Sequence, residues 1–468
     1  MRFPETLPSA IVHSVLEFMW GMLKTMLSGS SIMNANVEKT TIRKVYFRLL
    51  PLLFLAYFIC YLDRINVGFA ALTMNKDLGF TATVYALAAT AFFWGYCLFE
   101  VPSNIILEKV GARIWIARIM ITWGLFSGAT AFVTGATSFA GVRLFLGVCE
   151  AGFFPGMILY FTYWFPARYR GRVVGWFMTA IPVAIFLGGP ISTSVLVGLD
   201  GLLGLAGWRW LFLCEAAPAV ILGIVVLFYL TDRPAKAHWL EPHEREWLIA
   251  ELAAERSAVE QVRVYTVLQS LLNLRVLALA IIYLGIGTAS LGLVLFLPQM
   301  IKQLGVSNLM TGFATSVPYI VGTIGMIICG YITDHMYERR WNLFFTCLAA
   351  AVGLFAAALL TGSFWTLAVI AVATIGFYGM KTSFWPLPST FLSGTAAAAA
   401  IAGINSIGNL GGLIGPVAVG WLKDTTGSFE AGLFFLSGCA LISAIVTVLA
   451  VRERRPRAEP TGVGMAPA

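Results

Sequence analysis

Two oppositely charged residues lie inside one long apolar stretch of this chain. Arg143 and Glu150 fall within residues 139–165, a run long enough to cross a lipid bilayer as a helix. Seven residues are nearly two helical turns, so both side chains lie on one face, about 10 Å apart along the axis. Placing either charge in hydrocarbon is energetically costly. We therefore expect this face to line a water-filled cavity within the membrane.

A second charged pair, Asp63 and Arg64, lies late in the first long apolar run. Adjacent side chains on a helix point about 100° apart, so these two charges cannot simply neutralise each other. One interpretation is that Asp63 takes up a proton while Arg64 faces an anion. The alternative is an interfacial pair near the helix end. Ionisable residues at bilayer depth usually serve function, which favours the first interpretation.

Taken together, these four ions suit the binding of a carboxylate and a proton. The guanidinium group offers a bidentate fork to a carboxylate. A carboxylate in a partly dry cavity binds a proton more readily than one in water. We predict that Arg64 and Arg143 hold a substrate carboxylate and that Asp63 and Glu150 couple its movement to protons. For Arg143 and Glu150, a structural network between helices is the alternative.

Other polar groups in apolar runs are candidate substrate contacts. Lys381 lies mid-span, with Trp385 one turn later. Lys381 is either a third cation at the substrate or a side chain that snorkels to the interface. The further candidates are Tyr61, Tyr96, Asn405 and Asn409. For the last three, an interhelical hydrogen bond is an equally good account.

The composition identifies the elements that position these residues as membrane-spanning helices. The chain has 468 residues, of which 59% are hydrophobic and only 12% charged, against about 25% charged in soluble domains. Its net charge of +8 comes from Lys and Arg in short loops, which favours membrane topology over nucleic-acid binding. The seven cysteines show no CxxC spacing, and the four histidines fall outside the apolar runs. We therefore expect no cofactor, metal site or disulfide framework.

The apolar runs predict an all-α integral membrane protein of about twelve transmembrane helices in two six-helix halves. The spans fall near 46–74, 83–107, 113–134, 139–165, 173–198, 209–231, 275–300, 310–333, 343–361, 365–392, 399–422 and 430–451. We divide the chain into a leader (1–42), an N-terminal half (43–231), a linker (232–273), a C-terminal half (274–452) and a tail (453–468).

Two segments outside the spans have a recognisable character. The leader is either an interfacial helix or an upstream extension of a chain whose first residue is Met33, and we favour the second reading. The linker contains an amphipathic segment, Glu241–Glu260, with apolar residues at helical spacing. Basic residues gather on the side of the membrane that holds the linker and both ends of the chain. The positive-inside rule therefore predicts that both termini are cytosolic.

The two halves repeat each other in sequence. Gly189-Pro190 and Gly415-Pro416 lie about 226 residues apart, and the same offset relates two charged loops. Shared offsets at unrelated motifs favour duplicated halves, a pattern of secondary transporters. We predict that the charged loops act as gating latches between the halves, with ordinary topology charges as the alternative. The residues concerned are Glu108, Arg113, Asp334, Arg339 and Arg340.

With these motifs in place, the chain resembles the major facilitator superfamily, and within it the anion:cation symporter family. The resemblance covers about residues 43–452. It rests on YLDRINVGFA (61–70), GYCLFEVPSN (95–104), RLFLGVCEAGFFPG (143–156) and GINSIGNLGG (403–412). These motifs are most similar to those of the bacterial branch that imports tartrate, related hydroxy-acids or aromatic carboxylates.

The resemblance implies a proton symporter with alternating access in the bacterial inner membrane, working on a small organic anion, with no nucleic-acid partner and as a monomer. It implies proton coupling at Asp63 and Glu150 and carboxylate binding at Arg64 and Arg143. Ile181 replaces a glutamine found in some sugar-acid carriers, which argues against a polyhydroxylated substrate. The alternative within transport is an exchanger or exporter of organic anions. An enzyme is disfavoured, because no HExxH motif and no histidine lies in the spans.

Overall fold

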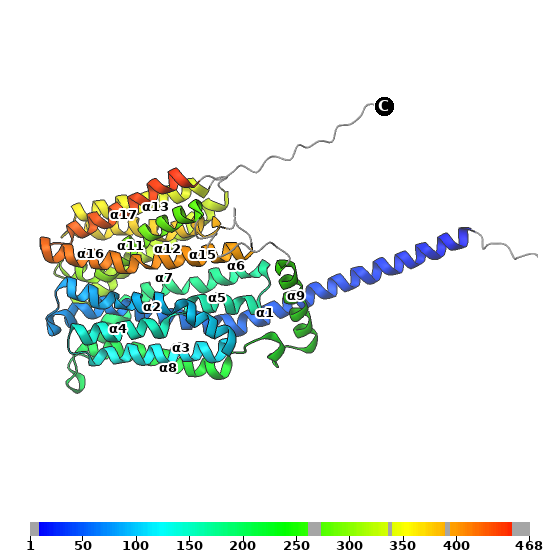
Figure 1. Cartoon of the computed structure of the whole chain (residues 1–468), viewed down its shortest axis with the longest axis horizontal. Helices are drawn as coiled ribbons and strands as arrows, with labels where there is room; N and C mark the ends of the chain where they lie inside the picture. Colours follow the sequence, from blue (N-terminus) through cyan, green and yellow to red (C-terminus); the bar gives the residue numbers. More distant parts are fainter. Residues whose placement is uncertain (1–8, 261–272, 336–338, 389–393, 452–468) are drawn as a thin grey trace, which may run out of the picture.

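The chain folds as a bundle of long helices (Figure 1). The structure is a computed structural model that describes residues 9–260, 273–335, 339–388 and 394–451. These residues form helices and no strands. The predicted fold class is confirmed: this is an all-α integral membrane protein.

The helices form two groups, which lie one above the other in Figure 1. The first group contains α1 (Ser9–Leu78), α2 (Ala82–Val110), α3 (Ala112–Ala129), α4 (Ala136–Glu150), α5 (Phe153–Trp164), α6 (Ala167–Met178), α7 (Ala180–Gly198) and α8 (Gly207–Tyr229). The second group contains α11 (Leu274–Lys302), α12 (Asn308–His335), α13 (Arg339–Leu359), α14 (Trp365–Phe384), α15 (Gly394–Asn409), α16 (Gly411–Thr426) and α17 (Glu430–Ala450). In the sequence, α9 (Pro242–Glu260) lies between the two groups. Short 3₁₀ turns occupy Thr130–Phe132, Leu202–Gly204 and Pro234–Lys236.

The twelve predicted spans fall on helices in the described part of the chain. Within the described residues, eleven helical segments are long and apolar enough to span a membrane. The twelfth is α15 followed by α16, which lie end to end in Figure 1. The break falls at Leu410, whose backbone stays helical at φ −62° and ψ −23°. The fourth crossing is also interrupted, because Gly152 has φ +86° and separates α5 from α4 directly after Glu150.

The predicted leader is continuous with the first span. Helix α1 begins at Ser9 and runs without a break to Leu78. Figure 1 shows that its N-terminal part extends beyond the bundle. The prediction that Met33 is the first residue stays a prediction.

The two groups contact each other tightly at the end of the bundle where α1 turns into α2. A Cβ on Gly189 of α7 would lie 2.3 Å from the carbonyl oxygen of Gly312 on α12, so these backbones meet directly. Asp424 near the end of α16 accepts hydrogen bonds from the backbone N–H groups of Ala82 (3.0 Å) and Thr83 (2.7 Å), which begin α2. These contacts hold the two groups together at what we call the Asp424 end.

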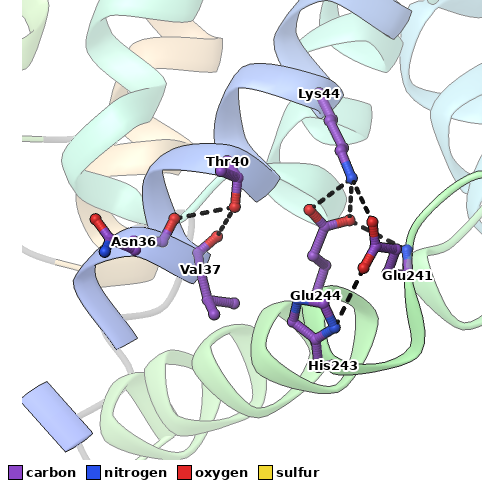
Figure 2. A network of polar contacts seen from close by, with 7 residues as sticks. All are labelled: Asn36, Val37, Thr40, Lys44, Glu241, His243 and Glu244. Carbon is purple, nitrogen blue, oxygen red and sulfur yellow. Dashed lines mark hydrogen bonds and ion pairs between the residues drawn. The ribbon is translucent and has the colours of Figure 1, made fainter. Parts of the chain in front are cut away.

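At the opposite end, α9 packs on the first group through ion pairs. Figure 2 shows the Lys44 ammonium of α1 between Glu241, at 3.3 Å, and Glu244, at 2.8 Å. Arg168 of α6 adds an ion pair to Glu251 of α9 at 2.6 Å. The predicted amphipathic segment is therefore confirmed as a helix, and its apolar residue Leu248 is fully buried.

Candidate functional site

A cavity of about 160 Å³ lies between the two groups of helices. Helices of the first group contribute Tyr61 and Arg64 from α1 and Arg143 from α4. Helices of the second group contribute Lys381 from α14 and Asn409 from α15. Five residues predicted from sequence as substrate contacts are therefore brought together around one space, although they span more than 300 positions of the chain.

Arg64 forms an ion pair with Glu150 across the α1–α4 interface. Its Nε lies 2.6 Å from Glu150 Oε1, and its Nη2 contacts the same oxygen. The Cys60 thiol also donates to that oxygen, at 3.3 Å. The Glu150 side chain is 1% exposed, whereas that of Arg64 is 25% exposed and borders the cavity. The sequence did not indicate this pairing, because the partners are 86 residues apart.

Asp63 faces away from the cavity, as the 100° offset from Arg64 predicts. It is 2% exposed, and three donors reach its carboxylate. The Trp123 indole donates to Oδ2 at 2.9 Å, and Asn66 Nδ2 donates to Oδ1 at 3.0 Å. The Ser127 hydroxyl donates to the same Oδ1. All of these contacts favour the ionised form of Asp63.

Two of the cations in the cavity have no carboxylate partner within the described part of the chain. Arg143 is 5% exposed, and its Nε lies 3.4 Å from the carbonyl oxygen of Ala89. The Lys381 ammonium lies 5.1 Å from the centre of the Tyr378 ring and forms no ion pair with a described residue. A buried or half-buried cation is stable only with an anion or good hydrogen-bond partners nearby. These two cations therefore favour the binding of an anion in the cavity.

The other predicted contacts lie beside this cavity and do not line it. The guanidinium of Arg64 lies 5.2 Å from the centre of the Tyr96 ring, so Tyr96 supports the arginine. Trp385 packs edge-on against Tyr283 at 5.0 Å, and Tyr283 itself borders the cavity. Asn405 is half-buried on α15. The role of Tyr96, Trp385 and Asn405 as substrate contacts stays a prediction.

Two of the predicted gating residues, Arg113 and Arg340, form hydrogen bonds that do not cross to the other helix group. The backbone N–H of Arg113 donates to Asp232 Oδ1 at 2.8 Å, while Glu108 is exposed. Arg340 donates to the carbonyl oxygen of Val448 on α17. Arg339 begins α13, and the side chain of Asp334 lies outside the described residues. Their role as latches stays a prediction.

The sequence did not single out Ile185, or two buried acids outside the cavity, Glu100 and Glu215. Ile185 of α7 forms an apolar wall of the cavity together with Ile181, which the sequence had already indicated as apolar. Glu100 of α2 is 7% exposed and contacts the Ser406 hydroxyl of α15, which links the two groups. Glu215 of α8 is 3% exposed. Both acids lie in apolar runs, so the criterion that identified Glu150 would have found them. No group of three metal-ligating side chains occurs among the residues described.

Comparisons with known proteins show which family and fold this chain resembles. A family model described as Major Facilitator Superfamily matches residues 53–416. A protein of Agrobacterium vitis named "Putative tartrate transporter" is 52% identical over 420 residues, which cover 90% of this chain and 96% of that protein. A "Quinolone resistance transporter" of Acinetobacter baumannii is 43% identical over 413 residues, covering 88% and 95%. The solved structure of the xylose transporter XylE from E. coli superimposes with a TM-score of 0.68 at 14% identity, covering 89% of this chain and 100% of XylE.

Proposed function

The chain belongs to the major facilitator superfamily, and we propose that it is a secondary transporter that imports a tartrate-like dicarboxylate together with protons. The observation that carries this proposal is the cavity between the helix groups, where Arg143 and Lys381 face the same space without a carboxylate partner among the described residues.

The charges around the cavity favour a guest with two carboxylates. Glu150 neutralises Arg64, which leaves the two positive charges of Arg143 and Lys381. These charges come from opposite helix groups, α4 and α14. A dianion placed between them would satisfy both, while a monoanion would leave one cation unpaired in a partly dry site. This argument favours a dicarboxylate over a simple aromatic acid.

The uncharged walls limit the size and polarity of the substrate. Ser290, Asn409 and the Tyr61 hydroxyl offer polar contacts for hydroxyl groups of a substrate. Ile181 and Ile185 offer none, and a hydroxyl placed against them would lose its hydrogen bonds to water. A short hydroxy-dicarboxylate such as tartrate matches this division better than a longer sugar acid. The name of the relative from Agrobacterium vitis supports the same choice.

Coupling to protons follows from the competition for Arg64. As long as Glu150 is ionised, it occupies two donors of the guanidinium group. When Glu150 takes up a proton, its attraction for Arg64 falls, and Arg64 becomes available to a substrate carboxylate. Substrate and proton would then bind together. Of the two carboxylates predicted to couple protons, we assign the exchanging proton to Glu150, because Asp63 is already held by three donors.

Alternating access would proceed by rocking of the two helix groups around this cavity. The contacts at the Asp424 end, including the Gly189–Gly312 approach, would close one entrance and would have to separate when that entrance opens. We propose that the end carrying α9 and both termini faces the cytosol of a bacterium and that the protein lies in its inner membrane. The basic residues near that end support this orientation.

The second candidate is export or exchange of an organic anion. It is favoured by one observation, the 43% identity to a relative named for quinolone resistance. It would use the same cavity cations but would not accumulate the anion inside.

Uptake into proteoliposomes tests the proposal. Purified protein is reconstituted, and uptake of labelled tartrate is measured with an inward proton gradient, without it, and with an uncoupler. We expect accumulation above equilibrium only with the gradient. Counterflow that is insensitive to the gradient would instead identify an exchanger, and the absence of tartrate transport in either assay would reject the substrate.

A further inference from the structure

Glu215 lies behind the substrate cavity, in a part of the N-terminal group that the proposed transport cycle does not use. It projects from α8, which packs against α1, α3 and α7. Its side chain is 3% exposed and it does not line the cavity. The charged state of this carboxyl group therefore depends on its protein neighbours and not on water.

The hydrogen bonds available to Glu215 are too few for a carboxylate. The Ser192 hydroxyl of α7 donates to Oε1 at 2.7 Å. The second oxygen, Oε2, has no hydrogen-bond partner. A buried carboxylate oxygen that carries charge and accepts no hydrogen bond is among the most costly arrangements in a protein interior.

Asn66 connects Glu215 to the better-supplied carboxylate of Asp63. Asn66 is fully buried, and its amide nitrogen donates to Asp63 Oδ1 at 3.0 Å. The same amide group also lies near Glu215, without a hydrogen bond to its Oε2. Its amide oxygen, like Glu215 Oε2, has no partner. Two neighbouring side chains thus each present an acceptor without a donor, and a single added proton would supply the donor that is missing.

The charged and titratable groups around Glu215 also disfavour a negative charge on its carboxyl group. Asp63 of α1 is the ionisable group facing it, and its negative charge opposes a second one nearby. Helix α3 contributes Trp123 and Ser127, both of which donate to Asp63, and α7 contributes Ser192. Among the described residues no cation pairs with Glu215, and Cys214 beside it on α8 is half-buried and adds no positive charge. Two buried carboxyl groups that share one amide cannot both be ionised at low cost.

We propose that Glu215 holds a resident proton, so that Asp63 and Glu215 form a buried carboxyl pair with one proton and one negative charge. Asp63 is the ionised member, because three donors hold its carboxylate. Glu215 is the neutral member, and its proton supplies the donor that Glu215 Oε2 and the Asn66 amide oxygen lack. This site is separate from Glu150, and it does not depend on which anion is transported.

Infrared spectroscopy of the purified protein in lipid tests this inference without any transport. At neutral pH, the Glu215→Gln variant should lose one carboxylic-acid C=O band relative to wild type, whereas Glu150→Gln, which removes an ion-paired carboxylate, should leave that band in place. Isotope labelling provides a test without a substitution. Carbon-13 in the glutamate carboxyl groups should move the band to lower frequency, and the same label in aspartate should not.

The proposal is overturned if the band survives in folded Glu215→Gln, or if it follows the aspartate label. Because Gln is a neutral isostere of the protonated acid, we also expect Glu215→Gln to keep a melting temperature close to that of wild type and the same pH profile of uptake, within about twofold. A folded variant that has lost gradient-driven accumulation would show that the proton on Glu215 exchanges, which contradicts a resident proton. If tartrate proves not to be a substrate, the infrared result is unaffected.

Discussion

Lys381 provides the cleanest test of how the cavity selects its substrate. It is the cavity cation contributed by α14, and it forms no ion pair with a described residue. Replacing it by Met therefore leaves no buried carboxylate without a partner. In contrast, removing Arg64 would leave Glu150, which is 1% exposed, without its counter-ion. Breaking a buried ion pair in this way costs about 3–5 kcal/mol of folding stability. We expect Lys381→Met to fold with an unchanged or slightly higher melting temperature.

The effect on binding follows from the loss of one charged hydrogen bond to the substrate. Such a bond contributes about 1.5–3 kcal/mol. Lys381 is half-buried, so water can partly replace it, and we take the lower part of this range. Each loss of about 1.4 kcal/mol in binding free energy raises Kd tenfold, so the Kd for tartrate should rise about 10- to 30-fold. A monocarboxylate such as lactate needs only one cation, and its weaker Kd should be the same in both proteins.

Isothermal titration with purified protein measures both constants. Lys381→Arg is the matched control, because it keeps the positive charge and should retain tartrate binding within a few fold. If folded Lys381→Met binds tartrate as tightly as wild type does, the second carboxylate is not held by this residue. The argument for a dicarboxylate would then be refuted.

Three further predictions concern coupling, packing and closure. Glu150→Gln should keep tartrate counterflow but lose gradient-driven accumulation in proteoliposomes, because an amide cannot take up and release the proton. Gly147→Ala should lower the melting temperature, because the added Cβ would lie 2.0 Å from the carbonyl oxygen of Phe92. Overpacking of this kind costs about 1–3 kcal/mol. Gly141→Ala on the same helix is the control, since a Cβ there would meet open space. Asp424→Ala should open the Asp424 end about fivefold more often, as expected for loss of a helix cap worth about 1 kcal/mol, which distances between spin labels on the two helix groups would report.

Each of these expectations has a clear opposite. Accumulation that persists in Glu150→Gln would place the coupled proton elsewhere. Equal melting temperatures for the two glycine variants would show that α2 and α4 can separate at little cost. An unchanged distance distribution in Asp424→Ala would show that this cap does not contribute to closure.

The sequence was a good guide to whatever depends on hydropathy and local spacing. Apolar runs predicted every crossing, and the 100° offset between Asp63 and Arg64 correctly indicated that they face different surroundings. It could not predict the helix interruption at Gly152, because the positive φ there depends on close packing against Ser103. Helical periodicity describes a helix by itself and not the helix it will contact.

Pairings between distant helices were the main information that the sequence lacked. The sequence placed Arg143 and Glu150 on one helix face in separate roles, and it did not show that Glu150 forms an ion pair with Arg64 on α1. Which residue lines the cavity depends on how α1, α3 and α4 rotate against one another. That rotation is set by many small contacts, such as the Gly147–Phe92 approach, and no local pattern reports it. For the same reason the sequence could not show that Asp63 and Glu215 are close enough to interact through their charges.

The central claim is that Arg143 and Lys381 stand at bilayer depth to hold an organic dianion between the two helix groups. The most direct measurement is an experimental structure of the protein in lipid with tartrate bound. Our account predicts one carboxylate within hydrogen-bond distance of Arg143 and the other within hydrogen-bond distance of Lys381. Tartrate bound elsewhere, or a dry, closed interior around these two residues, would contradict it.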